Sequence, residues 1–227
     1  MSGVWWGKTL RVIAIVFMAI TAFFTLAGGL GTSCVAFNPT GFGEDMSKLA
    51  PFQWLYIVFV VVTTAIGVMG ARAVFLLSKG RPNSYRYSVI ALVLGAAVGI
   101  VHILVSRALR GKSMPVDAVV YTTVLTLAIF LILRIPRLWR GVGGMGAGFD
   151  GGAGKLGAAI SLLICGALSL TVHVWAAPSH TWGGTNWAAA FLVTSTMFGW
   201  GLLLAGAALL LAPSGPAREP VSDRASA

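Results

Sequence analysis

Charged residues are scarce in this chain, and acidic residues are the scarcest of them. Only 10% of the 227 residues are charged, and six are Asp or Glu, whereas a soluble domain carries roughly 25% charged residues. No Asp or Glu lies in the middle of a long apolar segment. The chain therefore lacks the intramembrane carboxylates with which pumps usually carry protons and cations. A soluble globular domain is excluded, because most of the surface must face lipid or other apolar helices.

Sequence motifs for enzymatic chemistry are also absent. The chain contains no H-E-x-x-H, no G-x-S-x-G and no paired carboxylates, so it indicates no reaction and favours a non-catalytic role. The two cysteines, Cys34 and Cys165, are predicted at different depths, beyond the first apolar segment and near the middle of the fifth. We therefore expect no disulfide between them, and they indicate no redox compartment.

Six long apolar segments are the main positive feature. Each has about 18 to 24 residues, and at 1.5 Å per residue a helix of that length crosses a hydrocarbon core of roughly 30 Å. The sequence therefore predicts an all-α, polytopic integral membrane protein whose six transmembrane helices form one bundle within residues 1–212. The predicted helices are 10–30, 54–77, 87–106, 118–135, 156–176 and 188–211.

The connections between these segments differ in composition. The predicted outer loop 31–53 mixes aromatic and turn residues, so we expect it to pack back onto the helix ends or onto a partner. Segment 140–155 is glycine-rich and contains G-x-G-x-x-G, but no strand precedes it. It therefore reads as a flexible inner linker between a four-helix and a two-helix part. Residues 213–227 are predicted to be a disordered cytoplasmic tail.

Lysine and arginine are distributed unequally between the two sides of the predicted bundle. With both termini in the cytoplasm, eleven cations lie on the inner side and four on the outer side, while Arg72 lies within the second segment. This bias follows the positive-inside rule. The net charge of +10 therefore indicates contact with anionic lipid headgroups rather than nucleic acid. We expect a bacterial-type plasma membrane, because no organellar targeting segment is evident. The inner cations are Lys8, Arg11, Lys79, Arg81, Arg86, Arg134, Arg137, Arg140, Lys155, Arg218 and Arg224.

The outer connection after the third helix interrupts this pattern, because Arg107, Arg110 and Lys112 gather where cations should be rare. The outer side holds four cations, these three and Lys48, and three carboxylates. Two interpretations remain open. The charges form solvated ion pairs of about 0–1 kcal/mol each, or they form a site for an anion or a lipid headgroup. The carboxylates are Glu44, Asp45 and Asp117.

One face of the third helix carries small and polar residues. Gly95 and Gly99 form a G-x-x-x-G pair, and His102 and Ser106 continue the same face. Small residues allow a neighbouring helix to approach closely. We therefore predict that Gly95, Gly99 and Ser106 lie at a helix–helix contact.

The histidines suggest a cofactor. His102 and His173 are predicted at equal depth below the outer helix ends, so two imidazoles from different helices would be available to ligate a b-type haem. His180, in the following outer loop, offers a third nitrogen. The alternative is that His102 hydrogen-bonds across a helix contact and His173 reaches headgroups or water. No metal site is predicted.

Three functions follow from these features, in decreasing order of preference. The first is a non-catalytic subunit or scaffold of a larger membrane complex, whose partners are lipids and other membrane subunits or further copies of this chain. The second is a small transporter or a lipid- or anion-binding protein that uses the outer cations. The third is an electron-transfer subunit that holds haem through His102 and His173.

Overall fold

The computed structural model describes residues 4–145, 151–182 and 184–213. It is 86% helical and has six helices that are long and apolar enough to span a membrane, which confirms the predicted fold class. The six helices are α1 (Val4–Phe37), α3 (Gln53–Ser78), α4 (Ser84–Arg110), α5 (Val116–Leu133), α7 (Gly151–Leu170) and α10 (Leu192–Leu211).

Short elements connect the long helices. The segment between α1 and α3 contains η1 (Pro39–Phe42), α2 (Glu44–Ser47) and η2 (Ala50–Phe52). After α5 come α6 (Pro136–Gly141) and η3 (Gly143–Met145). Between α7 and α10 lie α8 (Val172–Trp175), η4 (Ala177–Ser179), the antiparallel strands β1 (Thr181–Trp182) and β2 (Thr185–Asn186), and α9 (Trp187–Ala190).

The long helices depart from the predicted boundaries at several ends. Helix α1 has 34 residues, about 51 Å at 1.5 Å per residue, and therefore extends beyond the hydrocarbon core. The fifth predicted helix ends at Leu170 rather than at residue 176, and the chain continues as α8. The sixth begins at Leu192 rather than at residue 188, because the preceding residues form α9.

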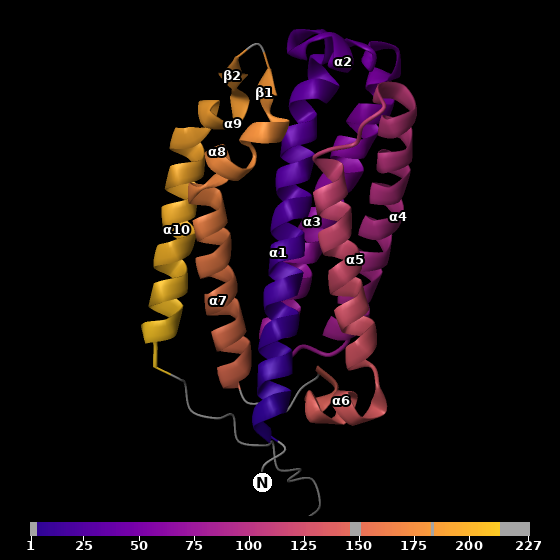
Figure 1. Ribbon diagram of the computed structural model, residues 1–227. Coiled ribbons are helices and arrows are strands. Elements are labelled where there is room, and N and C mark those ends of the chain that lie inside the picture. Colours follow the sequence, from indigo (N-terminus) through magenta and orange to yellow (C-terminus); the bar gives the residue numbers. More distant parts are fainter. Residues whose placement is uncertain (1–3, 146–150, 183, 214–227) are drawn as a thin grey trace, which may run out of the picture.

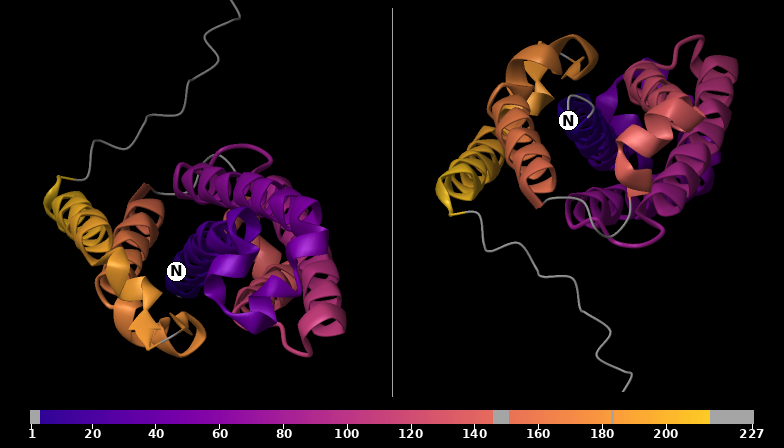
Figure 2. Two further views of the ribbon diagram at one scale, coloured as in Figure 1. Left: turned by 90° about the horizontal axis from the view of Figure 1, so that it is seen from above. Right: turned by 90° about the horizontal axis from the view of Figure 1, so that it is seen from below.

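Helix α1 lies in the middle of the bundle, between α3, α4 and α5 on one side and the α7–α10 pair on the other (Figures 1 and 2). It contacts α3, α5 and α7, whereas α10 packs mainly on α7. The start of α1 and the end of α10 lie at the same end of the bundle as α6 (Figure 1). We call this the inner end, after the orientation predicted from charge, and the end with α2 and the β hairpin the outer end.

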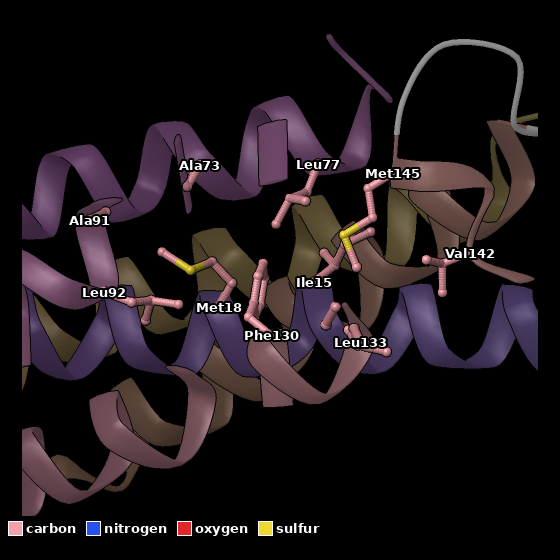
Figure 3. Close-up of a cluster of buried hydrophobic side chains, with 11 residues drawn as sticks. Ile15, Met18, Ala73, Leu77, Ala91, Leu92, Phe130, Leu133, Val142 and Met145 are labelled. Atoms are coloured by element: carbon pink, nitrogen blue, oxygen red, sulfur yellow. The ribbon is translucent and has the colours of Figure 1, made fainter. Parts of the chain in front are cut away.

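A cluster of buried apolar side chains fills the inner half of the four-helix part (Figure 3). It joins α1, α3, α4 and α5 to the segment that follows α6. Val142 and Met145 belong to this cluster, and the Ser84 hydroxyl donates to the Met145 carbonyl oxygen at 2.9 Å. The first part of the predicted glycine-rich linker is therefore packed into the core, while residues 146–150 lie outside the described residues.

The start of α7 packs tightly against the end of α3. A Cβ on Gly154 would overlap the carbonyl oxygen of Ser78, and one on Gly157 would lie 2.9 Å from Ile15 Cδ1 of α1. Glycine is needed at these two positions because the helices approach closely there. Part of the glycine-rich segment therefore serves helix packing.

The predicted outer loop packs back onto the helix ends. Met46 and Leu49 are buried in a second cluster together with Val35 and Ala36 of α1 and Tyr56 of α3. This arrangement encloses the outer end of the bundle between α1, α3 and α4, where the cations after the third helix gather.

Candidate anion site at the outer end

Arg107 is neutralised by a compact network at the turn between α4 and α5. Its Nη2 donates to Asp117 Oδ1 at 2.8 Å, and its Nε donates to Ser113 Oγ at 2.9 Å. The Ser113 hydroxyl donates in turn to Asp117 Oδ2 at 2.6 Å. Asp117 is only 5% exposed, and both of its oxygens are engaged. Arg107 therefore has a structural role in holding the turn.

Lys112 is neutralised at the surface. It forms an ion pair with Asp45, and the Lys48 ammonium forms a second ion pair with the same carboxylate at 3.4 Å. The hydrogen bond and the charge of Lys112 are the main causes that hold the pKa of Asp45 below its usual value. All three side chains are about half exposed, so these pairs add little to stability.

Arg110 differs from both of these cations. Its Nη1 contacts Met46 Sδ at 3.3 Å, and its Nε is buried without a hydrogen-bond partner. Among the residues that the structure describes, no carboxylate forms an ion pair with it. A guanidinium has five N–H donors that favour planar oxyanions. Arg110 therefore has no carboxylate partner in the described part of the chain, and it carries a buried N–H donor that a ligand would satisfy.

Arg110 borders a cavity of about 40 Å³ at the outer end, which we call the outer cavity. A water molecule needs roughly 10–15 Å³ of such space, so the outer cavity has room for a few waters or one small ion. Residues of α1, α2, α3, α4, α5 and η4, and of the segments that join these elements, line it. They are Gly31, Thr32, Val35, Met46, Leu49, Tyr56, His102, Arg110, Met114, Pro115, Val116, Ser179 and His180.

His102 lines this cavity and is only 5% exposed. Its ring stacks on Phe59 at a centroid distance of 4.2 Å and meets the edge of Tyr56 at 5.4 Å. The Tyr56 hydroxyl is hydrogen-bonded to Ser106 Oγ at 2.9 Å. No described group hydrogen-bonds the imidazole. The ring nitrogens are not among the buried side-chain atoms that lack a partner, so they are accessible to water or to a ligand in the cavity.

His180 reaches the outer cavity from the other part of the bundle. It belongs to the outer cap, which we define as α8, η4, the β hairpin and α9. Its Nδ1 lies 3.1 Å from the Ala176 carbonyl oxygen and 2.9 Å from Ser179 Oγ. A Cβ on Gly31 would lie 3.1 Å from its Nε2, so the ring lies close to α1. Burial lowers the pKa of His180, although the bond to Ala176 opposes this shift.

An aromatic contact also joins the outer cap to the rest of the outer end. Phe42 of η1 and Trp187 of α9 meet edge to face at 5.4 Å. The cap therefore contributes His180 to the cavity and rests on the segment that follows α1.

A second cavity, also of about 40 Å³, continues inward from the first. The two share Thr32, His102, Pro115 and Val116. The deeper one reaches Thr25 and Thr123, whose hydroxyls donate to carbonyl oxygens of their own helices at 2.7 Å. The Thr21–Thr126 hydroxyl pair, at 2.7 Å, links α1 to α5. One turn further along α5, Phe130 belongs to the buried apolar cluster of Figure 3.

The predicted helix-packing residues lie along this deeper cavity and above it. A Cβ on Gly99 would overlap Val120 Cγ2 of α5, whereas one on Gly95 would lie 3.4 Å from Ile66 Cγ2 and from Thr123 Cγ2. Ser106 is fully buried and bonded to Tyr56. All three positions on α4 therefore face neighbouring helices.

The structure does not bring His102 and His173 to one site. His173 lies in α8, and α1 lies between α8 and α4 (Figures 1 and 2). Its carbonyl oxygen accepts a hydrogen bond from Asn186. Neither cavity beside His102 is large enough for a haem, so the described residues do not fit that cofactor. Among them, no group of three His, Cys, Asp or Glu side chains is placed to hold a metal.

Of the residues singled out from the sequence, His102 and Arg110 meet at one cavity, whereas Arg107 and Lys112 are paired elsewhere. His180 joins them as the second histidine of the cavity. No spacing in the sequence indicates that His180 lies on the same cavity as His102 and Arg110, because the packing of α7 on α1 brings the cap to the cavity. No protein-family model matches this chain, and no curated protein or solved structure matches it either.

Proposed function

We propose that this multi-pass membrane protein binds an anion in the outer cavity, with Arg110 as its main charged contact. The observation that carries the proposal is the state of Arg110, whose Nε is buried without a partner and which no described carboxylate neutralises. Hydrogen bonds to charged groups are worth about 1.5–3 kcal/mol, so an oxyanion that meets this guanidinium gains substantially.

The shape of the site favours a small oxyanion group. Arginine binds phosphate-type and carboxylate oxygens through parallel N–H donors, and the outer cavity also presents Tyr56, His102 and His180. Two sources offer this chemistry at the outer end of a membrane bundle, namely a soluble oxyanion and the phosphodiester of an anionic lipid headgroup. The lining residues recognise the same group in either case.

The test compares two charge-removing variants of the same segment. Arg110→Gln removes the cavity guanidinium, whereas Lys112→Gln removes an exposed ammonium that lies outside the cavity. The protein is placed in phosphatidylcholine nanodiscs, and radiolabelled sulfate binding is measured by equilibrium dialysis. A second arm adds phosphatidylglycerol to the nanodiscs and measures retained lipid by native mass spectrometry.

We expect Arg110→Gln to weaken binding at least about tenfold, because 1.4 kcal/mol corresponds to a factor of ten. Lys112→Gln should change it by about twofold or less, since exposed pairs contribute little. Sulfate binding in phosphatidylcholine identifies a soluble anion as ligand, and selective retention of phosphatidylglycerol identifies a headgroup. Equal behaviour of both variants, or no binding in either arm, refutes the proposal.

A second candidate function, a subunit of a larger membrane complex, is favoured by the outer face of α10. Val193, Met197, Trp200 and Leu204 follow helical spacing, and each is more than half exposed. A Cβ on Gly201 would meet nothing within 4 Å, so a partner helix has close access to this face. Native mass spectrometry of the protein extracted from its own membrane tests this function. A subunit of a complex retains foreign chains, whereas a protein whose α10 faces only lipid does not.

A further inference from the structure

We infer that anion binding in the outer cavity is accompanied by proton uptake at His102. This inference rests on the proposed anion binding and adds the proton as a second ligand of the same site. The supporting geometry is the shared cavity: His102 and Arg110 both line it, and the imidazole has no hydrogen-bond partner among the described residues.

The surroundings of His102 are free of negative charge. From α3 it meets Tyr56 and Phe59, and from α4 it shares the cavity with Arg110. Helix α1 adds only Gly31, Thr32 and Val35 there, which are not titratable, and the outer cap adds His180.

The carboxylates of the outer end are directed elsewhere. Asp117 is engaged by Arg107 and Ser113, and Asp45 by Lys48 and Lys112. Glu44 is exposed and does not line the cavity. In the described part of the chain, therefore, no built-in anion compensates a charge on His102.

An anion in the cavity changes this balance. Without it, a proton on His102 adds a second positive charge beside Arg110 in a site of low dielectric constant. With it, the protonated imidazole faces a negative charge and donates a hydrogen bond to it. Anion binding therefore favours the protonated form, and by linkage protonation strengthens anion binding to the same extent.

The proton reaches His102 from the outer side. The outer cavity leads to the imidazole, and one ring nitrogen takes up the proton without any covalent bond between heavy atoms being made or broken. Inward of the deeper cavity, the apolar cluster of Figure 3 fills the space between α1, α3, α4 and α5. The site therefore loads its anion and its proton from the same compartment.

The experiment measures sulfate affinity against pH, from about pH 5.5 to about pH 8, where histidine titrates. Sulfate and the phosphatidylglycerol phosphodiester keep a constant charge over this range, so any pH dependence belongs to the protein. We expect the dissociation constant to rise with pH by up to about tenfold per unit. His102→Gln should remove this slope, whereas His173→Gln, a matched change outside the cavity, should retain it.

Calorimetry on the wild-type protein counts the proton directly. Titration in two buffers of different ionisation enthalpy gives the number of protons taken up with each anion, and it does not depend on the folding of any variant. Uptake approaching one proton per anion at the steepest part of the slope supports the inference.

The failures are distinguishable. If no anion binds at any pH, the proposed function fails, and this inference fails with it. If an anion binds through Arg110 with constant affinity and no proton uptake, only this inference is overturned. If the slope survives His102→Gln and disappears in His180→Gln, the assignment to His102 is also overturned.

Discussion

Two glycines on α4 provide a matched pair for testing how closely this helix packs. Gly99 and Gly95 lie about one turn apart and both face the deeper cavity. A Cβ on Gly99 would overlap Val120 Cγ2, whereas one on Gly95 would lie 3.4 Å from its two nearest neighbours. Gly99→Ala should therefore destabilise the bundle relative to Gly95→Ala.

The size of the difference follows from the contacts. Val120 is only 4% exposed, and a valine in a helix strongly prefers one χ1 rotamer, so relief of the overlap requires a shift of α5 or an unfavourable rotamer. Such overpacking costs about 1–3 kcal/mol. Replacing glycine by alanine in a helix gains up to about 1 kcal/mol, and both variants share this gain. Gly99→Ala should thus be less stable than Gly95→Ala by about 1–3 kcal/mol.

Reversible unfolding in mixed micelles, followed by far-ultraviolet circular dichroism, measures both free energies of unfolding against the wild type. Gly95→Ala is expected to match or slightly exceed the wild type, because its new methyl group meets side chains at close to ordinary contact distance. Equal free energies for the two variants would refute the reasoning, since they would show that α4 and α5 separate at Gly99 without cost.

Two further predictions concern the outer end. Asp117→Ala should lower the free energy of unfolding by about 2 kcal/mol and Asp117→Asn by about 1 kcal/mol. The loss is smaller for asparagine because it keeps an acceptor for the buried Ser113 hydroxyl. Equal losses in the same unfolding assay would contradict this prediction. Burial lowers the pKa of His180 in the docked outer cap, so the undocked cap binds a proton more readily than the docked cap. Docking of the cap is therefore most stable above about pH 6.5 and weakens as the pH falls below that value. In anion-free buffer, the part of the tryptophan fluorescence that is lost in Trp187→Phe should report this weakening, and His180→Gln should abolish its pH dependence. A pH dependence that persists in His180→Gln would show that another group is responsible.

The membrane spans were predictable because hydrophobicity and length are local properties of the sequence. The helix ends were not, because packing decides them. Helix α1 continues to Phe37, where Val35 and Ala36 are buried against α2 and α3. Hydropathy indicates which part of a helix is surrounded by lipid. Where a helix continues beyond the bilayer and is surrounded by protein, the sequence carries no comparable signal.

The glycines show a second limit of the same kind. The glycines of segment 140–155 predict a flexible linker, yet Gly154 lies in α7 directly against the backbone of Ser78. Glycine serves both purposes for the same reason, namely the missing side chain. Only the neighbour distinguishes them, and here that neighbour is more than seventy residues away in the sequence.

Charge counting predicted a surplus cation at the outer end but not which residue carries it. The α4–α5 turn brings Arg107 into an ion pair with Asp117, and the folding of α2 brings Asp45 into an ion pair with Lys112. Because Asp45 forms ion pairs with two lysines and Glu44 is exposed, no carboxylate of the described residues pairs with Arg110. A surplus cation in water would be screened and would select no ligand. Burial of the Arg110 Nε beside Met46, on the same cavity as His102, turns the surplus into a site.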